Sequence, residues 1–170
     1  MKLNDIKPIP ERLSLLMLIG LPGSGKSTWV ENFLRTTDKK YVVLSTDTII
    51  ERMAKEMGTT YSEIWSSAID EATRENYANF KTAIKNQQNI IWDQTNLTSR
   101  KRINVLSNVG SLYEKVAVTF ELPLDIIFER VENRAKETDK NIPKNILINM
   151  QKSYVKPSLD EGFDKIIKGN

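Results

Sequence analysis

The chain alternates short apolar runs with longer segments in which apolar residues recur every three or four positions. A short continuous apolar run between polar turns is typical of a strand buried on both faces of a parallel sheet. Such runs predict strands at residues 13–19, 41–44, 89–92, 115–120 and 162–167. Helical periodicity predicts helices between them, at 28–35, 48–57, 61–86, 99–109, 123–135 and 143–154. Because strands alternate with helices, we expect an α/β three-layer sandwich around a doubly wound, parallel five-stranded sheet.

The length and composition fit a single domain. A chain of 170 residues is long enough to bury a full core, and no repeat or Gly/Ser linker divides it. We therefore expect one domain over 1–170 with its core at about 13–168. The sequence contains no cysteine and no histidine, which excludes disulfides, Cys/His zinc sites and a histidine base. Acid–base chemistry is left to carboxylates and lysines.

The charge is nearly balanced, with 25 basic and 22 acidic residues giving a net charge of +3. This permits an anionic partner but does not by itself indicate nucleic acid. The first residues lack the apolar core of a signal peptide, and no apolar run has the length of a membrane span. We expect a cytoplasmic protein with no membrane partner, whose oligomeric state the sequence does not predict.

The segment 20–27 reads Gly-Leu-Pro-Gly-Ser-Gly-Lys-Ser between the first strand and a helix that opens at Lys26. Glycines let successive backbone N–H groups point inward at phosphates, and the helix N-terminus favours an anion. Lys26 then reaches the β- and γ-phosphates, and Ser27 offers its hydroxyl to Mg²⁺. The alternative is a glycine-rich turn with a chance lysine. The predicted nucleotide-binding residues of this loop are Gly20, Pro22, Gly23, Ser24, Gly25, Lys26, Ser27 and Thr28.

Two carboxylates, Asp47 and Asp93, stand directly after predicted strands, on the same sheet edge as the glycine-rich loop. Asp93 fits the residue that holds Mg²⁺ through its water shell, and Asp47 fits the base that deprotonates an acceptor hydroxyl. The alternative for each is a helix N-cap.

The loop after the third strand carries Thr95 and Asn96, which can contact an acceptor substrate or serve as turn residues. For Thr98 or Ser99 we favour helix capping. Arg100 and Arg102 belong to the same polar segment, and we expect each of them with equal weight to be a binding residue or simply a solvated charge on the helix.

Arg130 and Arg134 are spaced i, i+4 on one helical face, just before the charged segment 136–141. A cationic pair beside a mobile lid, at about 130–145, can bind donor phosphates as a site closes. The alternative is a surface pair favoured by the helix dipole.

The three tryptophans raise the question of base stacking. We expect Trp29 and Trp92 in the core, because both sit inside predicted elements. Trp65 and the neighbouring Tyr61 are the least constrained.

Together, the motifs resemble those of the polynucleotide 5′-hydroxyl kinases of phage and bacteria, within the small P-loop kinases. The resemblance covers about residues 16–167. It rests on Gly-Leu-Pro-Gly-Ser-Gly-Lys-Ser-Thr-Trp at 20–29, Ser-Thr-Asp at 45–47, Asp-Gln-Thr-Asn-Leu-Thr at 93–98, the spaced Arg130 and Arg134, and Pro-Ser-Leu-Asp-Glu-Gly-Phe-Asp at 157–164. The strand-end motifs also resemble the kinase-like domain of heterogeneous nuclear ribonucleoprotein U.

The resemblance implies roles for individual residues. Lys26 and Ser27 would bind phosphates and Mg²⁺, Asp47 would be the general base, and Arg134 would bridge the donor phosphates beside Arg130. Phage relatives often carry an arginine three residues after the catalytic aspartate, where this chain has Ile50. Arg52 lies nearby as a candidate acceptor-binding residue, although on a different helical face.

The first hypothesis is an ATP- and Mg²⁺-dependent kinase that phosphorylates the 5′-OH end of RNA or DNA, in the host cytoplasm if it is phage-encoded. The second keeps the chemistry but changes the acceptor to a small molecule, a modified nucleoside or a tRNA-linked hydroxyl. The third is a nucleotide-dependent RNA-binding module with little turnover.

Overall fold

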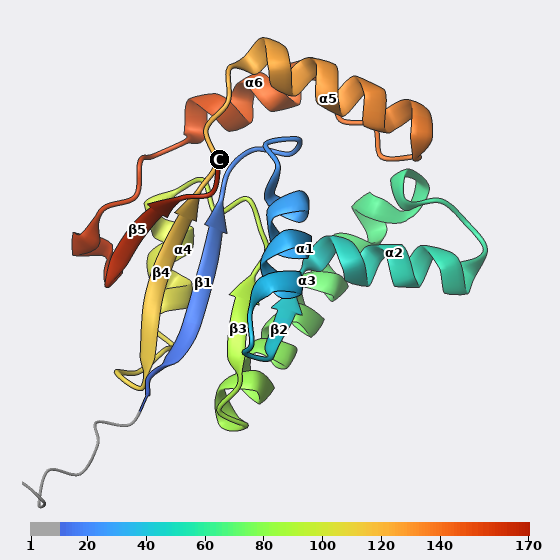
Figure 1. The fold of residues 1–170 in the computed structure, drawn as a ribbon. Coiled ribbons are helices and arrows are strands. Elements are labelled where there is room, and N and C mark those ends of the chain that lie inside the picture. Colours follow the sequence, from blue (N-terminus) through green and yellow to red (C-terminus); the bar gives the residue numbers. More distant parts are fainter. Residues whose placement is uncertain (1–10) are drawn as a thin grey trace, which may run out of the picture.

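The computed structural model describes residues 11–170. Five strands form one sheet in the order β2-β3-β1-β4-β5, and every neighbouring pair is parallel (Figure 1). The strands are β1 (Leu13–Ile19), β2 (Tyr41–Leu44), β3 (Asn89–Trp92), β4 (Tyr113–Thr119) and β5 (Lys165–Lys168). The predicted five-stranded parallel α/β fold is confirmed.

Helices cover both faces of this sheet. Successive side chains of β1 point to opposite faces, and each set packs into a different core. Leu16 and Leu18 pack with Val30 of α1 on one face. Leu15 and Met17 pack with Phe80 of α3 on the other face. The helices are α1 (Lys26–Thr36), α2 (Thr46–Met57), α3 (Tyr61–Lys85), α4 (Ser99–Leu106), α5 (Leu124–Glu137) and α6 (Lys144–Ser153), with a short 3₁₀ helix η2 (Leu159–Glu161).

Several predicted boundaries are wrong. β4 begins at Tyr113 instead of 115 and α4 ends at Leu106 instead of 109, and the last strand and the second helix begin at other residues than expected. The chain turns through η2 and then Gly162, whose φ is +112°, so β5 begins at Lys165 instead of near 162. Phe163 is buried, but in the core beneath the sheet and not in a strand. α2 begins at Thr46 because Ser45 takes an extended N-cap conformation immediately after β2.

α5 and α6 lie across the carboxyl edge of the sheet (Figure 1). Ile127 and Val131 of α5 share a separate core with Leu21, Leu97 and Leu147, so the two helices rest on the loops that follow β1 and β3. The glycine-rich loop, the start of α2 and the loop after β3 therefore converge beneath α5. Within residues 11–170 no helix has the length and apolar character needed to cross a membrane.

Candidate functional site

The glycine-rich loop is held in a conformation that needs glycine. Gly23 and Gly25 have φ values of +78° and +101°, a region that other residues rarely adopt. A Cβ on Gly20 would lie 2.7 Å from Ser24 Oγ and 2.8 Å from the Phe120 carbonyl oxygen. Gly25 is the N-cap of α1, and no side chain caps that helix. The first backbone N–H groups of α1 are thus available to an anion.

Lys26 is the first residue of α1, at the end of this loop, and is half-buried. Its Nζ donates hydrogen bonds to the carbonyl oxygens of Gly20 and Leu21, both at 2.8 Å. Burial lowers the pKa of Lys26 to about 8, opposed by the nearby carboxylates of Asp93 and Asp47 and reinforced by Arg134. These four side chains, far apart in sequence, are therefore close enough to act on one another.

The residues of the loop fit a triphosphate and a magnesium ion. Ser24 Oγ and Arg134 Nε are buried and have no hydrogen-bond partner among residues 11–170. Orphaned donors beside a cradle of free N–H groups are what a phosphate would satisfy. No cluster of three His, Cys, Asp or Glu side chains occurs in the described chain. Mg²⁺ takes one or two protein ligands plus phosphates and water. Ser27 and Asp93 are the residues that would hold it.

Asp47 and Asp93 both line a cleft of about 2000 Å³ that also contains the glycine-rich loop. Neither is a helix N-cap: Asp47 lies in the first turn of α2 after the N-cap Ser45, and Asp93 lies in the loop after β3. Burial raises the pKa of Asp93, with Lys26 opposing the shift. The capping alternative is therefore wrong for both carboxylates.

The Asp47 carboxylate has a partner that sequence reasoning did not assign. Tyr61, the first residue of α3, donates its hydroxyl hydrogen bond to Asp47 Oδ1 at 2.7 Å. Burial, together with this hydrogen bond, raises the pKa of Tyr61, so the phenol stays protonated. One carboxylate oxygen is thus fixed, and the other is left for a second donor.

The loop after β3 is mostly internal scaffolding. Asn96 has a positive φ of 49° and is buried, and its Nδ2 donates to the Leu18 carbonyl oxygen at 2.7 Å. Its Oδ1 accepts from Trp92 Nε1 at 3.2 Å, so both ends of the amide are occupied within the protein. The Thr95 carbonyl oxygen accepts from the Gly20 N–H at 3.1 Å, and Thr95 lines the cleft. Thr98 caps α4 as favoured, accepting from Lys101 N.

The interpretation of Arg102 as a solvated helix charge is wrong. Its side chain is fully buried and forms a bidentate ion pair with Glu161, at 2.6 and 2.7 Å. The same guanidinium donates to the carbonyl oxygens of Asn96 and Leu97. Arg102 therefore ties the loop after β3 to η2, and a pairing across this sequence distance leaves no local signal. Arg100 is exposed, as a solvated charge would be.

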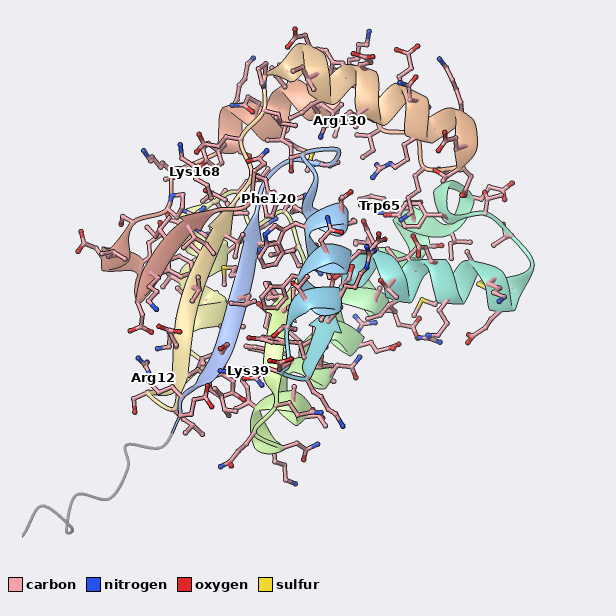
Figure 2. The ribbon with its side chains drawn as sticks, in the orientation of Figure 1. Arg12, Lys39, Trp65, Phe120, Arg130 and Lys168 are labelled. Atoms are coloured by element: carbon pink, nitrogen blue, oxygen red, sulfur yellow. The ribbon has the colours of Figure 1, made fainter. Side chains whose placement is uncertain are left out.

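Arg130 and Arg134 both line the cleft from α5. Figure 2 shows Arg130 on α5 above the glycine-rich loop, and its Nη1 lies 3.5 Å from the Gly23 carbonyl oxygen. The structure thus brings both predicted arginines to the loop.

The segment between α5 and α6 reaches across the cleft to α3. Asp139 accepts hydrogen bonds from the Ser62 backbone and side chain. Lys140 pairs with Glu51 of α2, and its Nζ stands 4.7 Å from the centroid of the Tyr61 ring. We name this set of contacts, made by Asp139 and Lys140 to Glu51, Tyr61 and Ser62, the latch.

Two predicted acceptor-side features lie outside the cleft. Ile50 is fully buried in the core between α2 and α3. Arg52 does not line the cleft, and its guanidinium is paired with Glu56 at 3.1 Å and Glu75 at 2.7 Å. The structure therefore does not bring Arg52 to the other predicted site residues, because the carboxylates of Glu56 on α2 and Glu75 on α3 bind it outside the cleft.

Trp92 lies in the core as expected. Trp29 is only partly buried, against the core on the other face of the sheet, and all three tryptophans line part of the cleft. Trp92 is buried, and Trp29 stacks on Phe33 with ring centroids 4.9 Å apart. Trp65 is 45 % exposed and lines the cleft.

The chain resembles known proteins over most of its length. Residues 15–157 match the family model AAA_33, described as an AAA domain. Human heterogeneous nuclear ribonucleoprotein U-like protein 2 is 24 % identical over 94 % of this chain, which spans only 22 % of that protein. A chain of the Pnkp1/Rnl/Hen1 RNA repair complex is 26 % identical with a TM-score of 0.69, covering 89 % of this chain and 46 % of that one.

A candidate kinase from Chloroflexus aurantiacus has a TM-score of 0.68 at 18 % identity, covering 94 % of this chain and 86 % of that one. This likeness shows the fold. The expected resemblance to small P-loop kinases is confirmed. The chain belongs to the AAA_33 family of AAA domains and has a P-loop kinase fold.

Proposed function

We propose that this chain is an ATP- and Mg²⁺-dependent kinase that transfers the γ-phosphate to the 5′-hydroxyl end of RNA or DNA. The observation that carries the proposal is the placement of Asp47, oriented by Tyr61, in the same cleft as the Lys26 loop. A carboxylate fixed at one oxygen and exposed at the other suits a base for an acceptor hydroxyl. The similarity to a chain of an RNA repair complex supports a nucleic-acid acceptor.

In the proposed reaction the acceptor hydroxyl oxygen forms a bond to the γ-phosphorus while the bond from that phosphorus to the β,γ-bridging oxygen breaks. Asp47 takes the hydroxyl proton, and ADP carries away the electron pair of the broken bond. Lys26, the α1 N–H groups, Arg130 and Arg134 meet the charge on the phosphates. Mg²⁺, held by Ser27 and through water by Asp93, would neutralise phosphate charge.

The test is incubation with γ-labelled ATP, Mg²⁺ and a panel of 5′-OH RNA and DNA oligonucleotides beside small alcohols. We expect labelled oligonucleotide ends. Asp47→Ala should lower transfer by about 10²- to 10⁴-fold, the range for a positioned base, while ATP binding persists. Lys26→Ala should weaken both binding and transfer. Label on no oligonucleotide end, or full transfer by Asp47→Ala, would contradict the proposal.

A second candidate function keeps the donor chemistry but uses a small hydroxyl compound as acceptor. The burial of Ile50 and the pairing of Arg52 favour it, since neither position supplies a cation to an acceptor phosphate. Label appearing on a small alcohol in the panel, and on no oligonucleotide, would select it. Tight ATP and RNA binding with no transfer to any acceptor would select the RNA-binding module instead.

A further inference from the structure

One face of α3 lines the cleft along several helical turns. Its members recur about every four residues, a spacing that places them on one side of a helix. They are Tyr61, Trp65, Ile69, Thr73, Asn76 and Tyr77. The row begins at the hydrogen bond from Tyr61 to Asp47, so α3 leads away from the proposed base as a continuous wall.

Trp65 is the first residue of this wall beyond Tyr61. Four residues of α-helix rise about 6 Å, which puts the indole one turn from the side chain that touches Asp47. Figure 2 shows Trp65 near the start of α3, beneath the C-terminal part of α5. Its indole is 45 % exposed, whereas Trp29 and Trp92 pack against other aromatic rings. A large apolar ring left open beside a proposed catalytic carboxylate is available to a flat ligand.

α4 lines the cleft beside the Tyr77 end of this row. Asn104 Nδ2 donates to the Tyr77 hydroxyl at 2.9 Å, which fixes α4 beside α3. Lys101 is exposed and stands one turn before Asn104 on the same face, nearer the carboxyl edge of the sheet. On α3 next to Tyr77, Asn76 is 2 % exposed and its Oδ1 has no hydrogen-bond partner in residues 11–170. A buried acceptor without a donor is satisfied by a ligand that brings one.

From these observations we propose that the groove between α3 and α4 binds the 5′-terminal nucleosides of a single-stranded acceptor, with Trp65 stacking on a base. The inference rests on the proposed function, because it takes Asp47 as the position of the reacting hydroxyl. Lys101 then lies along the path of the strand and pairs with a backbone phosphate, which neither Ile50 nor Arg52 does.

Stacking on Trp65 selects unpaired bases but not base identity. Every base has a flat π face, so an indole platform accepts all four with little preference. A base that stacks on Trp65 is not paired in a duplex, so single-stranded or frayed ends bind better than blunt duplex ends. Asn76 Oδ1 provides one hydrogen-bond acceptor to the bound nucleoside.

The kinetic test compares Trp65→Ala and Trp65→Phe with the wild type, using a 5′-OH oligonucleotide and ATP. Loss of one base stack should raise the acceptor KM about 10- to 100-fold in Trp65→Ala, with the KM for ATP little changed. Trp65→Phe keeps a ring and should recover most of the loss. Equal acceptor KM in Trp65→Ala and the wild type would overturn the stacking role.

Lys101→Ala should weaken acceptor binding and reduce the slope of log affinity against log salt by about one. Lys85→Ala is the matched control, because Lys85 is an exposed lysine at the far end of α3 and does not line the cleft. An unchanged salt slope in Lys101→Ala would remove Lys101 from the strand path.

A binding titration separates failure of this inference from failure of the proposed function. A single-stranded oligonucleotide should quench tryptophan fluorescence in the wild type, and the quenching should be lost in Trp65→Phe. This readout needs no phosphoryl transfer. Quenching without end labelling would contradict the kinase and keep the groove, whereas end labelling with no Trp65-dependent quenching would keep the kinase and overturn the groove.

Discussion

The hydrogen bond from Tyr61 to Asp47 fixes one oxygen of the proposed base. Removing the phenol oxygen leaves the Tyr61 ring beneath Lys140 but frees the carboxylate to rotate. Tyr61→Phe should therefore lower kcat about tenfold, the worth of one orienting hydrogen bond to a charged group, with the KM for ATP unchanged. Steady-state kinetics with a 5′-OH oligonucleotide measure both constants.

Tyr41→Phe provides the control for that prediction, since Tyr41 packs edge-on against Phe33, and the cleft does not include it. A Tyr61→Phe enzyme with wild-type kcat would show that Asp47 needs no orienting partner.

Lys26 makes nucleotide affinity depend on pH. Burial lowers its pKa to about 8 in the free protein, and bound phosphates, being anionic, favour the charged ammonium and raise that pKa. ADP affinity should fall toward tenfold per pH unit above pH 8, because binding must then take up a proton. Calorimetry in buffers of different ionisation enthalpy measures the uptake. Lys26→Arg keeps its charge throughout, so an equally steep fall in that variant would assign the titration to another group.

At the residue scale, the sequence predicts some site members better than others. Asp47 and Asp93 are predictable because they come just after strands, and parallel strands end at one edge of the sheet. Lys26 is predictable from the glycine-rich loop that precedes it. Tyr61 and Arg102 are not, because their partners Asp47 and Glu161 are distant in sequence and meet only after packing. The sequence allows Asn96 to be either an acceptor-binding residue or a turn residue. Its positive φ, which the sequence does not indicate, accompanies the hydrogen bond that its side chain donates to Leu18.

At the scale of elements, the latch joins the segment after α5 to the starts of α2 and α3. Lys140 pairs with Glu51 and stands over the ring of Tyr61, so the segment after α5 contacts the neighbourhood of Asp47. Breaking an ion pair of this partly exposed kind costs about 0.2–1 kcal/mol. Lys140→Ala should therefore raise the KM for ATP and for the acceptor by no more than about fivefold, measured by initial rates.

The charge swap Lys140→Glu with Glu51→Lys tests whether that effect belongs to the pair. In a double-mutant cycle the swap should recover part of the loss that each single reversal causes. Additive losses would show that Lys140 acts elsewhere, for example through its contact with the Tyr61 ring. Lys136→Ala, an exposed lysine on α5 that does not line the cleft, should leave both KM values unchanged.

The bounds of a helix or strand are predicted well where a single hydrophobic pattern, helical or strand-like, continues without interruption. β1 matches its predicted span at Leu13–Ile19, because its run of apolar residues is flanked by polar residues and glycine. α3 is likewise predicted almost to its end, with a capping box in which Thr60 and Glu63 bond reciprocally. The last strand is predicted, but its start is not, since its four residues are all exposed at the sheet edge and the turn at Gly162 precedes it.

At the scale of the whole molecule, the proposed nucleotide site draws residues from the loop after β1, the loop after β3 and α5. A ligand that needs all of them binds only the folded chain, so it stabilises the fold by mass action. At a hundred times its Kd the gain is about 2.7 kcal/mol, and for a chain of this size each kcal/mol raises Tm by about 2–4 °C. ATP with Mg²⁺ should thus raise Tm by about 5–11 °C in a thermal melt, and Lys26→Ala should lose most of that rise.

Hydrogen exchange then locates the effect: if α5 and the latch belong to a closing lid, residues 130–145 gain protection together with the glycine-rich loop. Protection confined to 20–28, with 130–145 unchanged, would show that nucleotide binds without closing that segment, and that the latch contacts form independently of the donor.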